Sequence, residues 1–287
     1  MGFRGALFSL PIVVAALAPA TAVAARMGSA DIAAVQVALR AHGLYSGTVD
    51  GVAGPGTRAA VRSMQRRAGL AADGIAGPQT LRALGRRGRP QLGRRALSDG
   101  ASGFDVGELQ FLLAWHGFPS GAIDGGFGSH TTAALRRFQR WARASADGVA
   151  GPATVSALST PPRRSPLAMA MPIRARFSDG FGPRGNHFHP GLDFPASTGT
   201  RVFAARSGRV TWAGWRSGGY GYLVSIAHGS GERSMYAHLS SIAVTRGRRV
   251  ASGALIGRVG STGLSTGPHL HFELRLRGAA LDPMTAF

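Results

Sequence analysis

The segment Asp73-Gly-Ile-Ala-Gly-Pro-Gln-Thr80 recurs as Asp147-Gly-Val-Ala-Gly-Pro-Ala-Thr154, and the likeness extends well to either side of it. Residues 35–84 align with residues 109–158 without a gap, and about half of the aligned positions are identical. A gapless register of this length is the signature of an internal repeat. The chain therefore contains two copies of one small module.

Each copy of the module has the pattern of three short helices. In the first copy, apolar residues recur at helical spacing over residues 32–42 and 57–68, and Gly43 and Gly69 end these runs. Pro78 has the place of a first-turn proline, which predicts a third helix. Both copies are therefore predicted to be small all-α three-helix modules.

Segments rich in Gly, Arg, Ser or Pro separate the modules from each other and from the C-terminal part of the chain, which predicts linkers. The predicted organisation is a signal peptide over residues 1–25, module 1 over 31–86, a linker over 87–103, module 2 over 104–160, a linker over 161–171 and a C-terminal domain over 172–287.

The C-terminal domain has period-two alternation of apolar residues and frequent glycine instead of helical spacing. Strands are predicted over 192–194, 200–203, 208–212, 222–227, 234–238, 255–259 and 270–276. No helical pattern interrupts this run. The predicted fold class is multidomain, with two all-α modules followed by an antiparallel all-β domain.

Six of the nine histidines lie in this β domain. His189 and Asp193 are four residues apart, but Pro190-Gly191 excludes a helix, so a turn has to bring both side chains together. His269 and His271 lie two apart at the start of a predicted strand and therefore face one side of the sheet. Two histidines, one carboxylate and a water fill the four coordination positions of a catalytic zinc ion. The other imidazoles can transfer protons near neutral pH.

Several motifs of this domain together resemble those of the lysostaphin-type (LytM-like) zinc endopeptidases of bacterial cell walls. They are His189-Pro-Gly-Leu-Asp193, Tyr236-Ala-His-Leu239, Gly260-Ser-Thr-Gly263, Gly267-Pro-His-Leu-His-Phe-Glu273 and Asp282-Pro283. Through residues 73–80 and 147–154, the repeated modules are similar to the helical peptidoglycan-binding module.

The resemblance implies roles for five residues. The family's zinc ligands fall on His189, Asp193 and His271, and its two catalytic histidines fall on His238 and His269. In that role the two histidines orient and deprotonate a zinc-activated water, while zinc polarises the scissile carbonyl. The resemblance thus implies a peptidase domain over 172–287, Zn²⁺ as its cofactor and peptidoglycan as its substrate.

One position departs from the family's pattern. Members that cut between glycines carry a tyrosine shortly before the first ligand, whereas this chain has Gly182, Pro183 and Arg184 there. Stabilisation of the oxyanion then falls to Arg184, to a catalytic histidine or to the metal. Glycine bridges, stem-peptide bonds and D-alanine cross-links all stay open as the bond that is cut.

Composition and the N-terminus indicate where the protein acts. The net charge is +20, every basic residue is arginine, and this excess favours anionic partners. Residues 1–25 have the pattern of a secretory signal peptide, with Arg4, an apolar stretch over 6–18 and Ala22-Val23-Ala24 as a cleavage site. The apolar stretch is too short to span a bilayer. The absence of cysteine excludes disulfides and cysteine-nucleophile hydrolases.

The predicted location is therefore outside the cytoplasm, in the cell wall or periplasm. The predicted partners are peptidoglycan and anionic wall polymers, without nucleic acid and without a membrane span after signal cleavage. Two alternatives to a peptidase are a non-catalytic regulator that activates amidases and a wall-adhesion protein in which binding is the function.

Other residues near these motifs have structural interpretations. Surface, helix-end, turn or capping roles are predicted for His187, His228, His42, His116, Asp50, Asp124 and Asp282. Core positions, and not sugar-stacking surfaces, are predicted for Trp115, Phe138 and Trp141. Two roles are equally compatible with Glu273. Its carboxylate orients a ligand histidine, or it is an exposed residue of the strand.

Overall fold

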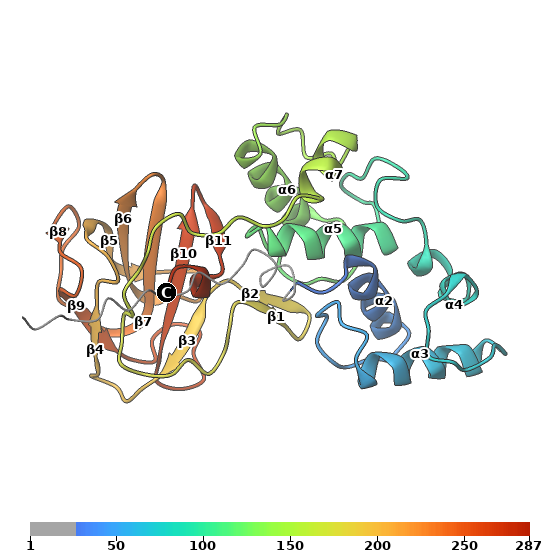
Figure 1. Cartoon of the computed structure of the whole chain (residues 1–287), viewed down its shortest axis with the longest axis horizontal. Helices are drawn as coiled ribbons and strands as arrows, with labels where there is room; N and C mark the ends of the chain where they lie inside the picture. The colour runs from blue at the N-terminus through green and yellow to red at the C-terminus, as the bar shows by residue number, and fades with distance from the viewer. Residues whose placement is uncertain (1–26) are drawn as a thin grey trace, which may run out of the picture.

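The computed structural model describes residues 27–287, so the predicted signal peptide lies outside the described residues. A helical part formed by the two modules lies beside a β domain formed by the C-terminal part, as Figure 1 shows. Within residues 27–287, no helix combines the length and apolar character needed to cross a membrane.

Each module consists of three helices, as the repeat predicts. Module 1 has α2 (Ala30–Ala41), α3 (Pro55–Arg67) and α4 (Pro78–Ala83), and module 2 has α5 (Phe104–Trp115), α6 (Ser129–Trp141) and α7 (Pro152–Leu158). Pro78 and Pro152 both occupy first-turn positions, where the missing N–H costs the helix nothing. The two modules pack together mainly through α2 and α5.

A buried polar unit occurs twice in each module. In its first occurrence, the Gln36 side-chain amide donates to Asp50 and Thr57, and its oxygen accepts from the backbone of Gly51. The same bonds are made around Gln65, Gln110 and Gln139. These bonds satisfy the polar groups of each turn inside the module, and the predicted turn role of Asp50 is confirmed.

The β domain is an antiparallel sheet in the order β11-β10-β7-β6-β5-β8, with β3 on β10 and β9 joining β7 and β4. Its strands are β3 (Leu192–Pro195), β4 (Arg201–Phe203), β5 (Gly208–Arg216), β6 (Gly221–Gly229), β7 (Glu232–Ile242), β8 (Arg249–Val250), β9 (Leu255–Val259), β10 (His269–Leu276) and β11 (Ala279–Leu281). All seven predicted strands are present, and β8 and β11 are additions that the sequence did not indicate. The main apolar core of the domain contains Phe194, Tyr236 and Phe272.

A short hairpin outside the main sheet joins the β domain to the modules. It consists of β1 (Gly182–Arg184) and β2 (His187–His189), which pair only with each other. At its tip, the backbone N–H of Val49 donates to Gly185 and that of Ile123 donates to Asn186, both at 2.7 Å. Val49 and Ile123 are equivalent positions of the two modules, so both copies bind the hairpin through the same position.

The segments predicted as linkers are packed against their neighbours. In residues 87–103, Leu97 is fully buried and its backbone pairs with Ala150 of module 2. In residues 161–171, the backbone N–H groups of Met169 and Ala170 donate to carbonyls of the β domain. The connections are therefore ordered parts of the structure.

Candidate metal centre and active site

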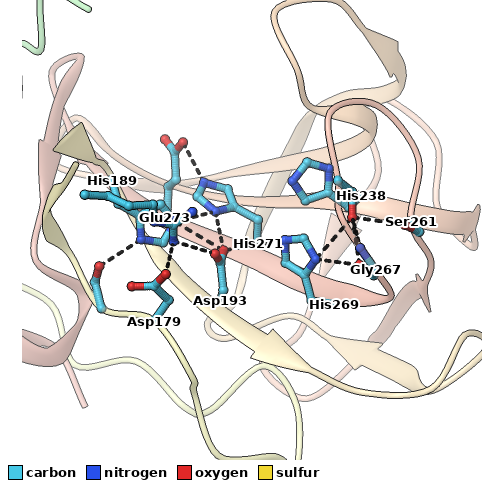
Figure 2. A network of polar contacts seen from close by, with 12 residues as sticks. Asp179, His189, Asp193, His238, Ser261, Gly267, His269, His271 and Glu273 are labelled. Carbon is cyan, nitrogen blue, oxygen red and sulfur yellow. Dashed lines mark hydrogen bonds and ion pairs between the residues drawn. The ribbon is translucent and has the colours of Figure 1, made fainter. Parts of the chain in front are cut away.

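The three predicted ligands come together from neighbouring strands. His189 ends β2, Asp193 lies in β3, and His271 lies in β10 directly opposite Asp193. Asp193 Oδ1 lies 2.8 Å from His271 Nδ1 and 3.2 Å from His189 Nε2, and the two nitrogens are 3.0 Å apart. The sheet register therefore makes the three side chains converge on one point (Figure 2).

The turn between His189 and Asp193 needs a glycine at position 191. A Cβ atom there would stand 2.3 Å from the carbonyl oxygen of Phe272 and 3.0 Å from the ring of His271. Both separations are below ordinary contact, so any side chain would push β10 away from the turn. Gly191 thus explains why the His-Pro-Gly-Leu-Asp motif can bring its two ends to β10.

Hydrogen bonds behind the two histidines fix which ring nitrogen faces the convergence point. Nδ1–H of His189 donates to the Gly180 carbonyl at 2.8 Å, and Nε2–H of His271 donates to Glu273 at 3.0 Å. The opposite nitrogens therefore present lone pairs toward Asp193. Tetrahedral zinc with ligand distances of about 2.0–2.2 Å separates its donors by about 3.3 Å, so this donor set fits zinc after an expansion of a few tenths of an ångström.

Glu273 is buried behind His271, which decides between the two roles that the sequence left open. Its carboxylate accepts from His271, from the Tyr220 hydroxyl at 3.0 Å and from Arg275 at 2.7 Å. Burial opposes its ionisation, but the positive charge of Arg275 and the bond from His271 lower the pKa of Glu273 to about 2. Glu273 is thus an ionised partner that orients His271.

The carboxylate of Asp193 is also fixed on its other side. Arg184 Nη2 lies 2.8 Å from Asp193 Oδ2 and 2.6 Å from Asp179. Burial opposes ionisation of Asp193, yet the hydrogen bonds and positive charge that His189 and His271 supply when their rings carry both protons hold its pKa far below the ordinary value. Arg184 therefore neutralises the ligand carboxylate, and this engagement argues against the oxyanion role that the sequence left open for it.

The two predicted catalytic histidines lie together at the other side of the site. The rings of His238 and His269 are 4.6 Å apart, and Nε2 of His269 is 3.7 Å from Asp193 Oδ1 (Figure 2). Nδ1–H of His238 donates to the Thr262 carbonyl, and Nδ1–H of His269 donates to the Gly267 carbonyl, both at 2.8 Å. Each Nε2 is left without a proton and can accept one.

His238 has a left-handed backbone conformation, with a φ of 60° inside β7. Few non-glycine residues adopt this conformation, and those that do are concentrated at functional sites. Burial lowers the pKa of His238 to about 4, with a smaller contribution from the neighbouring His271 and His269. His238 is therefore neutral at neutral pH and available as a proton acceptor.

The residues with predicted structural roles lie as expected, with the exception of Trp141. His116 bonds the Leu158 carbonyl through Nε2 at 3.0 Å, and Asp282 caps the last 3-10 turn. His187 is exposed, and His228 bonds Ser207 and Ser234 away from the metal ligands. Of the three aromatic residues predicted in the core, Phe138 and Trp115 are buried, whereas Trp141 is only partly covered.

Several partners of the site could not be read from the sequence. The carbonyls of Gly180 and Thr262, together with Tyr220 and Arg275, orient the histidines, but they lie on other segments. The Gly260-Ser-Thr-Gly263 motif was visible without a role, and the structure shows that its Thr262 holds His238.

Two family models match the chain. Residues 187–283 match the model described as "Peptidase family M23". The C-terminal domain belongs to peptidase family M23. Residues 28–84 and 102–158 match the model described as "Putative peptidoglycan binding domain", which covers both modules of the repeat. Family M23 consists of zinc metallopeptidases, and the ligand set of this M23 domain fits that metal.

Curated relatives align with about two fifths of the chain. DD-carboxypeptidase/endopeptidase Mpg of Neisseria meningitidis is 43% identical over 119 residues, and peptidoglycan DD-endopeptidase ShyA of Vibrio cholerae is 40% identical over 119 residues. Each alignment covers 39% of this chain and 27% of the relative, so the chain spans about a quarter of their length. The lysostaphin catalytic domain of Staphylococcus simulans is 39% identical, with a TM-score of 0.36, over 38% of this chain and 90% of that structure.

Proposed function

We propose that this protein is an exported zinc endopeptidase that hydrolyses peptide bonds in peptidoglycan stem peptides or cross-links. His189, Asp193 and His271 hold the zinc ion, and His238 and His269 handle protons. The observation that carries the proposal is the convergence of two imidazole lone pairs and one carboxylate oxygen beside two further imidazoles. This is a catalytic donor set with room for water in place of a fourth side chain.

Zinc, when bound, activates water and polarises the scissile carbonyl as a Lewis acid. The chain's own residues supply the remaining steps. The free Nε2 atoms of His238 and His269 accept the proton of the attacking water and orient it toward the peptide carbon. The protonated imidazole then donates to the leaving amine, which completes the proton transfer without another residue.

The two modules are proposed to retain the enzyme at its insoluble substrate. Their match to a peptidoglycan-binding family supports this role. Attachment to the wall raises the effective concentration of the M23 domain near its peptide bonds. Because both modules also bind the β1–β2 hairpin, the modules and the proposed active site have a fixed relation in this structure.

Paired histidine variants test the proposal. His271→Ala should remove both bound zinc and cleavage, whereas His269→Ala should keep zinc and lose cleavage by roughly 10²–10⁴-fold. Metal content is measured by mass spectrometry of the purified protein, and cleavage by identifying the muropeptides released from defined cell walls, which also names the bond. His187→Ala, an exposed histidine beside the site, is the control and should change neither. A wild-type protein without zinc, or a fully active His269→Ala variant, would refute the proposal.

A further inference from the structure

An open cleft lies where module 2 meets the turn between β10 and β11. It consists of two adjoining hollows of about 290 and 620 Å³ that share Trp141, Arg143 and Arg277. Six arginines line it: Arg137, Arg140, Arg143, Arg163, Arg164 and Arg277. Among the described residues, no Asp or Glu lines either hollow, so the cleft is strongly cationic.

Direct contacts between module 2 and the β domain fix the two walls of the cleft relative to each other. The backbone N–H of Ala280 in β11 donates to the carbonyl of Gly117 at 3.0 Å. Ala279 is fully buried in the apolar core of module 2, which also contains Phe118 from the cleft. The cleft therefore has a defined shape in this structure.

Two of the arginines occupy backbone conformations that disfavour arginine. Arg143 has a φ of 61° just after α6, where module 1 has Gly69 with a φ of 68°. Arg277 has a φ of 51° in the two-residue turn Arg277-Gly278, where asparagine is the favoured first residue. Left-handed backbone is unfavourable for a residue with a side chain. Arginine at these two positions therefore opposes stability.

Such conformations are rare in the described part of the chain. Its four non-glycine residues with positive φ are Arg143, Ser230, His238 and Arg277. His238 belongs to the proposed active site, and the other three line the cleft. Unfavourable backbone that a fold retains tends to mark a functional site.

Three of the arginines in the cleft have no polar partner among the described residues. The side chains of Arg140, Arg143 and Arg277 make no hydrogen bond or ion pair within residues 27–287. Burial, followed by the charges of Arg275 and Arg140, lowers the pKa of Arg137, as expected for a cation crowded by cations. Arg163 lies over the ring of Trp141 at 5.4 Å, which gives the cleft an apolar face beside its charges.

We propose that this cleft binds the carboxylates of peptidoglycan stem peptides at a distance from the bond that is cut. Guanidinium groups pair with carboxylates in a two-bond geometry, and Trp141 offers a surface for the apolar part of the peptide. The stem peptide is favoured as the occupant because both walls belong to domains that act on peptidoglycan, so this step rests on the proposed function. Arg277 lies six residue steps beyond His271 along extended β10, about 20 Å, so the cleft contacts a different part of the wall.

The test uses substitutions that suit the backbone. Arg143→Gly with Arg277→Asn places favoured residues at both left-handed positions, so the double variant should melt a few degrees higher than the wild type. Adsorption to purified peptidoglycan sacculi in EDTA should nevertheless fall at least tenfold. Arg66→Ser with Arg67→Ser removes two charges from the equivalent end of α3 in module 1 and is the matched control, which should retain most of the adsorption.

Chemically modified sacculi identify the ligand. Converting the stem carboxylates to amides should weaken wild-type adsorption and cause little further loss in the double variant. Equal adsorption of the double variant and the control would overturn the proposal. So would wild-type adsorption that survives amidation but is abolished by inorganic polyphosphate, because the cleft would then recognise phosphate-bearing polymers. EDTA removes the metal, so the readout does not depend on whether the M23 domain cleaves.

Discussion

At the residue scale, the carboxylate of Glu273 controls how firmly His271 is presented to a metal. Glu273→Gln should weaken zinc binding by about 10- to 100-fold, because it removes the charge that holds the His271 ring and tautomer in place. The affinity is measured by competition with a chromophoric chelator. Glu232→Gln is the control, since Glu232 is an equally buried carboxylate of the same sheet that bonds Ser165 outside the site. Equal zinc affinities of the two variants would show that Glu273 does not act on the metal site.

The three residues that converge at the proposed metal site could be named from the sequence, but the groups that orient them could not. Alternation along β10 places His269, His271 and Glu273 on one face, so the sequence already set Glu273 beside a ligand. Glu273 is buried because Tyr220 and Arg275 cover its carboxylate. That contact depends on the sheet register, which cannot be read from the alternation of apolar residues.

At the element scale, the β1–β2 hairpin was missed because its strands have three residues each and the first of them begins with Gly182-Pro183. So short a run carries no readable alternation. The hairpin is held largely by groups remote in sequence, including Trp115 of module 2, whose ring lies 5.4 Å from Phe188 and 6.1 Å from Phe181. Phe188 directly precedes the ligand His189.

The buried glutamine unit, in contrast, was readable in the sequence. Asp50, Asp73, Asp124 and Asp147 are each followed by glycine and, seven residues on, by threonine. This spacing shows that each module is itself built from two similar halves. The similarity of the halves was obscured by the stronger similarity between the two modules.

Trp115→Leu should weaken zinc binding about tenfold in the folded protein, because a smaller side chain no longer fixes Phe188 and the position of His189 beside it. Phe138→Leu is the matched control, since Phe138 is a buried aromatic residue of module 2 that does not contact the hairpin. Both variants should lose stability, by about 1–3 kcal/mol. Zinc titrations well below both melting temperatures separate the two effects, and the same zinc affinity in both variants would contradict the expectation.

At the scale of the whole molecule, the order of the parts could be predicted from the sequence, but their packing could not. Arg- and Pro-rich composition predicted linkers, whereas Leu97 and Met169 within them are buried. The two modules approach closely at Gly107, where an added Cβ would stand 3.5 Å from the Cα of Ala34. Contacts of this kind join residues far apart in the chain, and local composition does not report them.

The interface between the modules contains a carboxyl group that should make stability depend on pH. Burial, together with a hydrogen bond that protonated Glu108 in α5 donates to Asp31 of α2, raises the pKa of Glu108 from 4.5 to about 8. The folded protein therefore holds a proton that the unfolded chain releases above pH 4.5. Glu108 contributes its full stability below pH 4.5, and that contribution is lost as the pH rises to about 8.

The wild type should lose about 1–3 kcal/mol of unfolding free energy relative to Glu108→Gln between pH 4.5 and 8, because glutamine keeps the neutral shape and cannot ionise. Melting temperatures of both proteins, measured from pH 4.5 to 8, give the difference in stability. The effects of all other titrating groups are the same in both proteins and cancel. A difference that stays constant from pH 4.5 to 8 would mean that Glu108 is already ionised in the fold. The pH-dependent difference would instead identify the junction between the modules as the origin of the effect, since Glu108 and Asp31 lie on opposite sides of it.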